Sequence, residues 1–140
     1  GRIINQMIDK YVAKNTHKSV GFTSLGQLKY LSALKYVDAV VGNSSSGLTE
    51  TPSFNIGTIN IGDRQKGRVK ADSIIDCLPN KLSIKKAFEV LYSKEFQKIL
   101  KVSKNPYDNG CASKNIVKSL KNVKLGNILK KRFFNIRYLP

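Results

Sequence analysis

Val40-Val41-Gly42-Asn43-Ser44-Ser45-Ser46-Gly47-Leu48-Thr49-Glu50 joins a short apolar segment to a segment that is compatible with a helix. The apolar run at 37–41 predicts a β-strand, and the two glycines that bracket the polar residues predict a tight loop. A strand that leads through such a loop into a helix start presents free backbone N–H groups and a partial positive charge. This corner therefore suits a phosphate group, and its serine hydroxyls add further donors without bulk.

Strand and helix patterns alternate on both sides of this corner. Strands are expected at 19–23, 38–41, 57–62 and 73–77, and helices at 1–14, 26–36, 48–54, 84–100, 112–123 and 125–134, with Ser24 and Ser83 as helix caps. The alternation predicts an α/β fold with a Rossmann-like parallel sheet flanked by helices. Ligands of such sheets bind at the carboxyl ends of the strands, where the segments 23–25, 42–50 and 62–68 would meet.

Length and hydropathy indicate a single globular domain. The chain has 140 residues, of which 41% are hydrophobic, and this is enough to bury a core. No apolar run reaches the roughly 18 residues of a membrane span, and the first residues do not resemble a signal peptide, so we expect a cytoplasmic protein. The chain opens within an expected helix and without Met, which leads us to expect a fragment or a processed product.

The chain is strongly basic, with a formal net charge of +16 from 25 Lys and Arg against 9 Asp and Glu. Lysines outnumber arginines by 20 to 5, whereas phosphate and base recognition favours Arg. We interpret the lysines as solvated helix faces and expect no specific nucleic-acid partner and no membrane partner. The segment from Lys101 to the end of the chain holds ten cations and only Asp108 as an anion, so a polyanion-binding module stays an alternative.

Few residues are available for metal or triad chemistry. The two cysteines, Cys77 and Cys111, form no metal or redox motif and are interpreted as free thiols, although one disulfide is arithmetically possible. The single histidine, His17, falls in an expected turn. The serines of the corner do not match Gly-x-Ser-x-Gly, so a nucleophile elbow is not indicated.

Two charged residues near the expected phosphate site each have two interpretations. Glu50 either stabilises the first turn of its helix or accepts hydrogen bonds from the hydroxyls of a ribose. Arg64 is either a surface cation of its loop or a charge partner for a diphosphate or for Glu50.

The combination of motifs resembles a known enzyme family. The resemblance is carried by Gly42-Asn43-Ser44-Ser45, Glu50, Pro52-Ser53-Phe54, Asn60-Ile61-Gly62-Asp63-Arg64-Gln65-Lys66-Gly67-Arg68 and Asn105-Pro106-Tyr107. Together these are similar to the hydrolysing UDP-N-acetylglucosamine 2-epimerases of the sialic-acid pathway. The similarity covers nearly the whole chain, and it implies the C-terminal, UDP-binding lobe of a two-lobed GT-B fold.

The resemblance implies a role for each expected site residue. Ser44 and Ser45, next to Asn43, would hold the diphosphate, and Glu50 would bind the ribose hydroxyls. Arg64 matches a UDP-site arginine of the family, and the segment around Leu25 would contact the uracil through backbone groups. The family reaction eliminates UDP with loss of the proton on carbon 2 and then hydrates the resulting glucal to N-acetylmannosamine, without a metal or redox cofactor.

The resemblance also implies that the enzyme is incomplete here. The acid/base carboxylates of the family lie in an N-terminal lobe that this chain lacks, so no catalytic residue is expected and the chain alone should be inactive. Residues 1–124 would form the UDP-binding lobe without its first strand, and residues 125–140 a helix and tail that pack toward the other lobe. We expect the complete enzyme to be a homodimer or larger and to serve sialic-acid or capsule synthesis. A UDP-N,N'-diacetylbacillosamine 2-epimerase of the legionaminic-acid pathway is the alternative.

Overall fold

The structure is a computed structural model, and it describes residues 2–108 and 110–126. Contacts divide the chain into two compact units, Gly1–Tyr107 and Asp108–Pro140, and each is described by itself. The sheet and the helices that pack against it belong to the first unit, whereas the helix expected at 112–123 belongs to the second. The expected helix at 125–134 falls, from residue 127 onward, outside the described residues.

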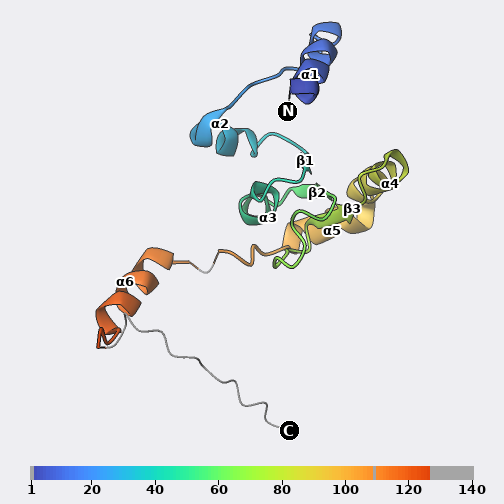
Figure 1. Cartoon of the computed structure of the whole chain (residues 1–140). Coiled ribbons are helices and arrows are strands. Elements are labelled where there is room, and N and C mark those ends of the chain that lie inside the picture. Colours follow the sequence, from blue (N-terminus) through green and yellow to red (C-terminus); the bar gives the residue numbers. More distant parts are fainter. Residues whose placement is uncertain (1, 109, 127–140) are drawn as a thin grey trace. The chain divides into compact units, whose positions relative to one another are not determined.

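Helices and strands follow one another as Figure 1 shows. In chain order they are α1 (Arg2–Lys14), α2 (Gly26–Ala33), β1 (Ala39–Gly42), α3 (Ser46–Thr49), the 3₁₀ helix η1 (Thr51–Phe54), β2 (Gly57–Ile61), β3 (Ile74–Cys77), α4 (Lys81–Leu91), α5 (Lys94–Val102) and α6 (Ala112–Asn122).

The sheet consists of three parallel strands in the order β1-β2-β3. At the carboxyl end of the sheet, Asn60 of β2 pairs with Gly42 of β1 on one side and with Asp76 of β3 on the other. The loops that follow β1 and β2 therefore leave the sheet at the same edge. The predicted parallel α/β sheet flanked by helices is confirmed.

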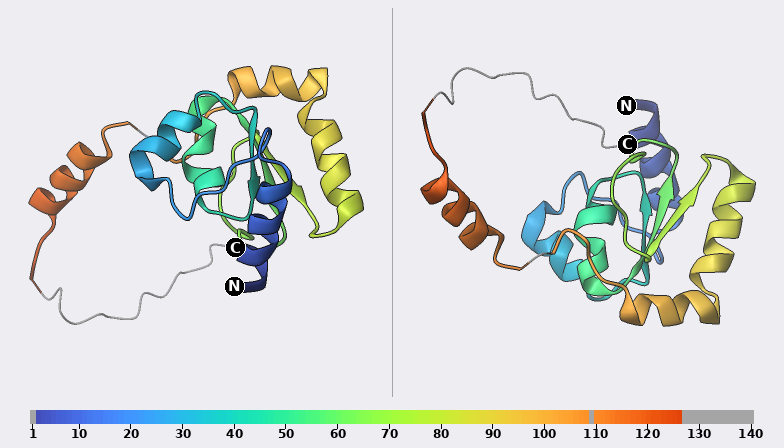
Figure 2. Two further views of the ribbon diagram at one scale, coloured as in Figure 1. Left: turned by 90° about the horizontal axis from the view of Figure 1, so that it is seen from above. Right: turned by 90° about the horizontal axis from the view of Figure 1, so that it is seen from below.

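One face of the sheet packs against α4 and α5, which lie on the opposite side of the strands from α3 in Figure 2. The core on this face consists of Ile59, Ala87, Leu91, Phe96 and Leu100, all nearly inaccessible to solvent. Gly57 allows this close packing, because a Cβ atom there would collide with Leu91 and lie only 3.2 Å from Phe96.

The other face of the sheet packs against α3 and η1. Thr58 alternates with Ile59 along β2, so its side chain faces α3, where its hydroxyl donates a hydrogen bond to the carbonyl of Gly47 at 2.9 Å. A Cβ atom at residue 47 would lie 2.7 Å from Thr58 Cγ2, so glycine is needed for this approach. Leu48 and Thr51 are fully buried behind the same contact.

Two predicted elements differ from the structure. No strand forms at 19–23: Val20 and Phe22 are mostly exposed, and the described part of the sheet offers that segment no paired neighbour. The helix predicted at 84–100 is interrupted after α4, because Ser93 caps a second helix by accepting a hydrogen bond from the amide of Phe96. The hydrophobic pattern of the sequence did not predict this break, because apolar residues recur at helical spacing in both helices.

The predicted helix caps are also corrected. Asn80, rather than Ser83, caps α4, because its side chain accepts a hydrogen bond from the amide of Ser83. The hydroxyl of Ser83 accepts instead from the amide of Leu78. Ser24 does accept a hydrogen bond from the amide of Gly26 at 3.2 Å, but Leu25 occupies the cap position of α2.

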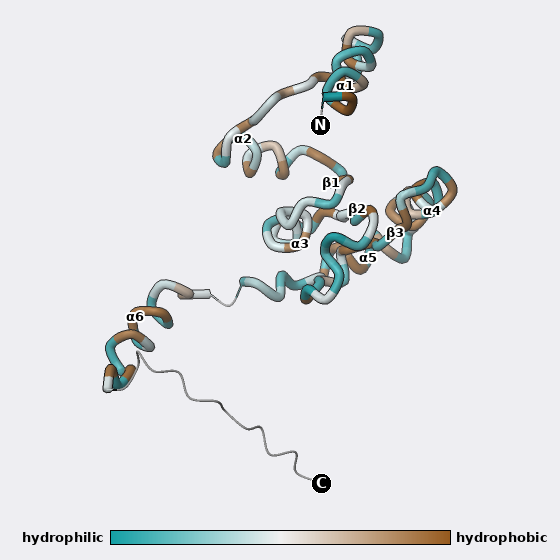
Figure 3. Tube along the Cα trace, viewed as in Figure 1, coloured by the Kyte–Doolittle hydropathy of each residue, from teal (hydrophilic) through white to brown (hydrophobic). Residues whose placement is uncertain are grey.

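In the second unit, the described helix α6 is amphipathic and exposed along its length. Its apolar residues Ile116, Val117 and Leu120, and Val123 at its C-terminal cap, are each at least 45% exposed. Figure 3 shows hydrophobic and hydrophilic positions alternating along both α1 and α6. Over the described ranges, none of the helices combines the length and apolar character that crossing a bilayer would require.

Candidate functional site

The segment 42–47, which carries Ser44, Ser45 and Ser46 and is called the serine corner below, lies where β1 ends. Gly42 has φ of 153°, a conformation that side chains rarely adopt, and it turns the chain away from the sheet. The helix that follows begins at Ser46, two residues earlier than predicted, and it spans only four residues before the 3₁₀ helix. Because so short a helix has a small dipole, the local amides and hydroxyls must provide most of any attraction for an anion.

Two backbone donors of this corner are free. Within the described residues, no hydrogen bond occupies the amide groups of Ser44 and Ser45. The amide of Ser46 contacts Ser44 Oγ at 3.4 Å, a distance at which the bond is weak. Both Ser44 and Ser45 are exposed. The corner therefore presents donors to solvent, as the sequence predicts.

A cavity of about 650 Å³ lies beside this corner. It is lined by Phe22, Ser24, Leu25, Gly26, Gln27, Tyr30, Val40, Ser44, Ser46 and Glu50. Three of the six expected site residues, Leu25, Ser44 and Glu50, thus share one cavity. Leu25 reaches it from a segment that is not a strand, so the structure brings the segments together although the predicted strand at 19–23 is absent.

Ser46 and Tyr30 are cavity residues that the sequence did not indicate as site residues. The hydroxyls of these two residues lie 2.5 Å apart, which joins α2 to the start of α3. Ser46 stands in the same serine run as the expected ligands, whereas Tyr30 lies within the helix expected at 26–36 and belongs to no motif. Its role depends on a contact between residues that are 16 positions apart.

The loop at 62–68 is tied to the corner by Gln65. The Gln65 side chain is 2% exposed, and its Nε2 donates a hydrogen bond to the backbone carbonyl of Asn43 at 2.7 Å. Arg64, next to it, is exposed and does not line the cavity. Asn43 is exposed as well. The hydrogen bond therefore links the corner to the loop that carries Arg64.

Residues of the segment 105–107 brace the same region. Asn105 Nδ2 donates to the carbonyl of Thr49 at 2.8 Å and to Ser53 Oγ at 2.7 Å, which holds the end of α3 and η1. Tyr107 donates its hydroxyl hydrogen to the carbonyl of Val69 at 2.9 Å, just beyond the loop at 62–68. Hydrogen bonds thus link the three motif segments, 42–54, 60–68 and 105–107, at or just beyond their ends.

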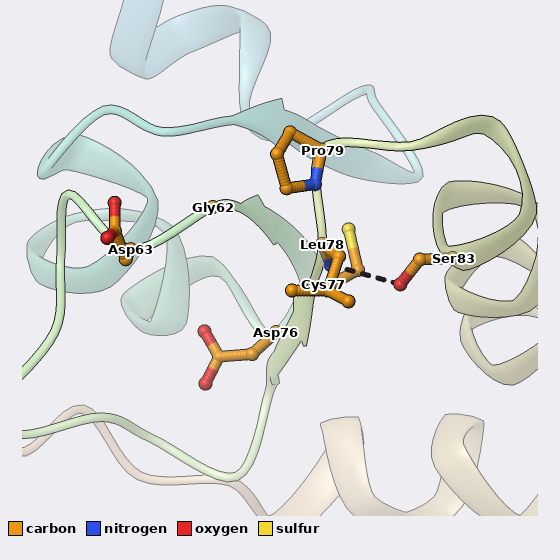
Figure 4. A pocket seen from close by; sticks show the side chains of 7 residues that line it. All are labelled: Gly62, Asp63, Asp76, Cys77, Leu78, Pro79 and Ser83. Carbon is orange, nitrogen blue, oxygen red and sulfur yellow. Dashed lines mark hydrogen bonds between the residues drawn. The ribbon is translucent and has the colours of Figure 1, made fainter.

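A second hollow, of about 460 Å³, opens at the carboxyl ends of β2 and β3. It is lined by Gly62, Asp63, Asp76, Cys77, Leu78, Pro79 and Ser83, which Figure 4 shows as sticks. In that view the carboxylates of Asp63 and Asp76 point in different directions. Burial, followed by the charge of Asp76, raises the pKa of the Cys77 thiol, so this thiol is not activated for reaction.

Asp76 is held by two hydrogen bonds. Asn60 Nδ2 donates to its Oδ1 and Lys70 Nζ to its Oδ2, each at 2.7 Å. Burial alone would raise the pKa of Asp76, but these two hydrogen bonds and the charge of Lys70 outweigh it and leave the pKa below its usual range. The cluster fastens the segment before β3 to the carboxyl end of the sheet.

We predict that this cluster makes stability depend on acid pH. A carboxylate whose pKa is lower in the folded state stabilises the fold above its unfolded pKa, near 3.8, and loses that contribution as the pH falls further. Because the Asp76 side chain is 54% exposed, solvent screening should limit the effect to about 1 kcal/mol or less.

Urea unfolding between pH 6 and about 3 should show a flatter pH dependence for Asp76→Asn than for the wild type. Asp72→Asn, at an exposed position, is the control; an unchanged slope in Asp76→Asn would contradict the prediction.

Comparisons with known proteins point to one enzyme family. A family model described as UDP-N-acetylglucosamine 2-epimerase matches residues 1–121. The chain is 50% identical over 137 residues to a GDP/UDP-N,N'-diacetylbacillosamine 2-epimerase (hydrolyzing) of Campylobacter jejuni, covering 97% of this chain and 35% of that protein. It is 39% identical over 137 residues to the polysialic acid biosynthesis protein P7 of Escherichia coli, with the same coverage.

A further relative is similar to a shorter part of the chain. Over 77 residues the chain is 35% identical to a UDP-N,N'-diacetylbacillosamine 2-epimerase (hydrolyzing) of Legionella pneumophila, covering 54% of this chain and 20% of that protein. The chain thus spans about a third of the length of the relatives that it matches most extensively. The family match, which covers most of the chain and all three motif segments, shows that this chain belongs to the UDP-N-acetylglucosamine 2-epimerase family.

Proposed function

We propose that this chain is the UDP-binding part of a hydrolysing UDP-sugar 2-epimerase, corresponding to the C-terminal lobe of a GT-B fold. The observation that carries the proposal is the serine corner: it offers two free amides and two exposed hydroxyls, and its Ser44 lines a cavity together with Leu25 and Glu50. Donors at the end of a parallel strand, next to a cavity with one carboxylate, suit a diphosphate attached to a ribose.

Each expected residue has a proposed task. Ser44 and Ser45, with Asn43 beside them, bind the diphosphate, and Arg64 neutralises its charge from the neighbouring loop. Glu50, half-buried in the cavity wall, accepts hydrogen bonds from the ribose hydroxyls. Leu25 lies across the cavity, where its backbone contacts the uracil.

In the longer protein, UDP would act as the leaving group of an elimination. The proton on carbon 2 is lost as the bond between carbon 1 and the UDP oxygen breaks, and water then adds to the resulting glucal. Binding the diphosphate stabilises the negative charge that develops on UDP as it leaves. The carboxylates for proton transfer belong to the part of the enzyme outside this chain, so these 140 residues should bind UDP without turning over the sugar nucleotide.

Two sugar nucleotides are candidate substrates of the complete enzyme. UDP-N-acetylglucosamine, giving N-acetylmannosamine for sialic acid, is the first, as the motif resemblance implies. UDP-N,N'-diacetylbacillosamine is the second, and the 50% identity to the Campylobacter jejuni protein favours it. Release of UDP from each nucleotide by the full-length protein, measured side by side, distinguishes the two.

Titration of the intact protein with UDP tests the proposed site. Ser45→Ala should weaken UDP binding about 10- to 100-fold, since hydrogen bonds to charged groups contribute roughly 1.5–3 kcal/mol. Isothermal calorimetry measures the dissociation constant directly. Ser32→Ala, at an exposed position of α2, should bind as the wild type does. Equal affinities of Ser45→Ala and wild type would refute the assignment of the corner to the diphosphate.

A further inference from the structure

We infer that Gln65 is a positioning residue for the nucleotide site, an inference that rests on the proposed function of the serine corner. Its amide group fixes the backbone of the corner in the conformation that presents the free amides to a diphosphate. It does so from the adjacent loop, so it also sets the distance between that corner and Arg64. Gln65 itself is buried and would not touch the nucleotide.

The hydrogen bond of Gln65 reaches the residue that precedes the free donors. The Asn43 carbonyl, which accepts from Gln65 Nε2 at 2.7 Å, belongs to the same peptide group as the amide of Ser44. Holding that oxygen therefore fixes the direction in which the Ser44 N–H points, because the peptide group is planar. An N–H group that already points toward the ligand site loses less conformational entropy when a ligand binds.

A role of Gln65 in positioning the corner can be tested separately from a role in the stability of the fold. Its Oε1 is buried and has no hydrogen-bond partner among the described residues, so the side chain already leaves one polar atom unsatisfied. Asn43, by contrast, is an exposed residue, so we expect water to reach its carbonyl once Gln65 is replaced. An apolar side chain of similar length should thus cost little stability while releasing the corner.

The test compares UDP with uridine in the intact protein. Gln65→Met should raise the dissociation constant of UDP about 3- to 10-fold, the loss expected for one hydrogen bond, and leave that of uridine unchanged. The nucleoside would be held by Leu25 and Glu50, which line the cavity, whereas Gln65 is not among the residues that line it. The amides of Gly47 and Leu48 donate to the carbonyls of Ser44 and Ser45, and their hydrogen exchange should become faster in the variant without ligand.

A control with the same type of bond is available in α5, where Gln97 reaches back to the end of α4. Gln97 Nε2 donates to the carbonyl of Leu91 at 2.8 Å, the same type of bond on the far face of the sheet. Gln97→Met should change neither affinity. If Gln65→Met folds poorly, Gln65→Asn, which is one methylene too short to reach Asn43, should show the same difference between UDP and uridine.

The outcomes separate this inference from the proposed function. If the wild-type protein does not bind UDP, the proposed function fails. If the wild type binds UDP and the Gln65 variants bind it equally well, the positioning role is refuted. A parallel loss of UDP and uridine binding would also refute it, because it would indicate general disruption rather than a misdirected corner.

Discussion

Leu48→Ala should lower the free energy of unfolding by about 2–5 kcal/mol, the range observed for large-to-small changes in protein cores. Leu48 is fully buried directly behind the serine corner. The neighbouring Gly47 is held against Thr58 by a hydrogen bond and close packing, so the backbone has little freedom to fill the resulting cavity. The destabilisation should therefore fall in the upper part of that range.

Urea unfolding followed by circular dichroism measures this loss. Leu28→Ala removes the same atoms from a side chain that is 81% exposed, and it should leave the midpoint nearly unchanged. Leu91→Ala, fully buried on the opposite face of the sheet, should be destabilised as strongly but keep its affinity for UDP under native conditions. If Leu48→Ala unfolds at the same urea concentration as Leu28→Ala, the packing behind the corner is not as described.

Arg64→Ala should weaken UDP binding about 10- to 100-fold, since a charge-assisted contact to phosphate contributes roughly 1.5–3 kcal/mol. Arg64 is exposed in the unliganded protein, so its guanidinium retains its hydration until the nucleotide binds. The hydrogen bond from Gln65 to Asn43 keeps this loop next to the corner. The affinity of the wild type should also fall as salt is raised, because added ions screen the attraction.

Arg68 provides the control for charge. It lies in the same loop and is exposed, so Arg68→Ala removes one positive charge without removing the proposed contact. Calorimetric titrations at about 0.05 and 0.5 M salt should show that Arg64→Ala loses both affinity and most of the salt dependence, while Arg68→Ala keeps both. Equal losses in the two variants would mean that the loop attracts UDP only through its net charge.

Hydrophobic and turn patterns predicted most of the sheet correctly. The strands at 57–62 and 73–77 correspond to β2 and β3 with shifts of one residue, and the strand at 38–41 corresponds to β1. These segments are β-branched and bounded by glycine or polar turns, so their signal is local. The segment at 19–23 has a similar pattern but no neighbour within the described sheet, and a strand cannot be stable without a paired edge.

The sequence by itself determined the alternation of strands and helices, the turn at Gly42 and the serine corner. It also predicted Glu50 and Arg64 as charged neighbours of that corner. All of these follow from short-range chemistry: backbone freedom of glycine, periodic apolar residues and donors of known type. The sequence also carried enough of the motif pattern to identify the epimerase family.

Only the tertiary structure decided which of these residues meet. It placed Leu25, Ser44 and Glu50 around one cavity, left Arg64 outside it, and brought Tyr30 to Ser46. It also buried Gln65 against Asn43, a contact between residues 22 positions apart. The physical reason is that such contacts depend on strand order and on packing across the sheet, and neither is encoded in the pattern of any single segment.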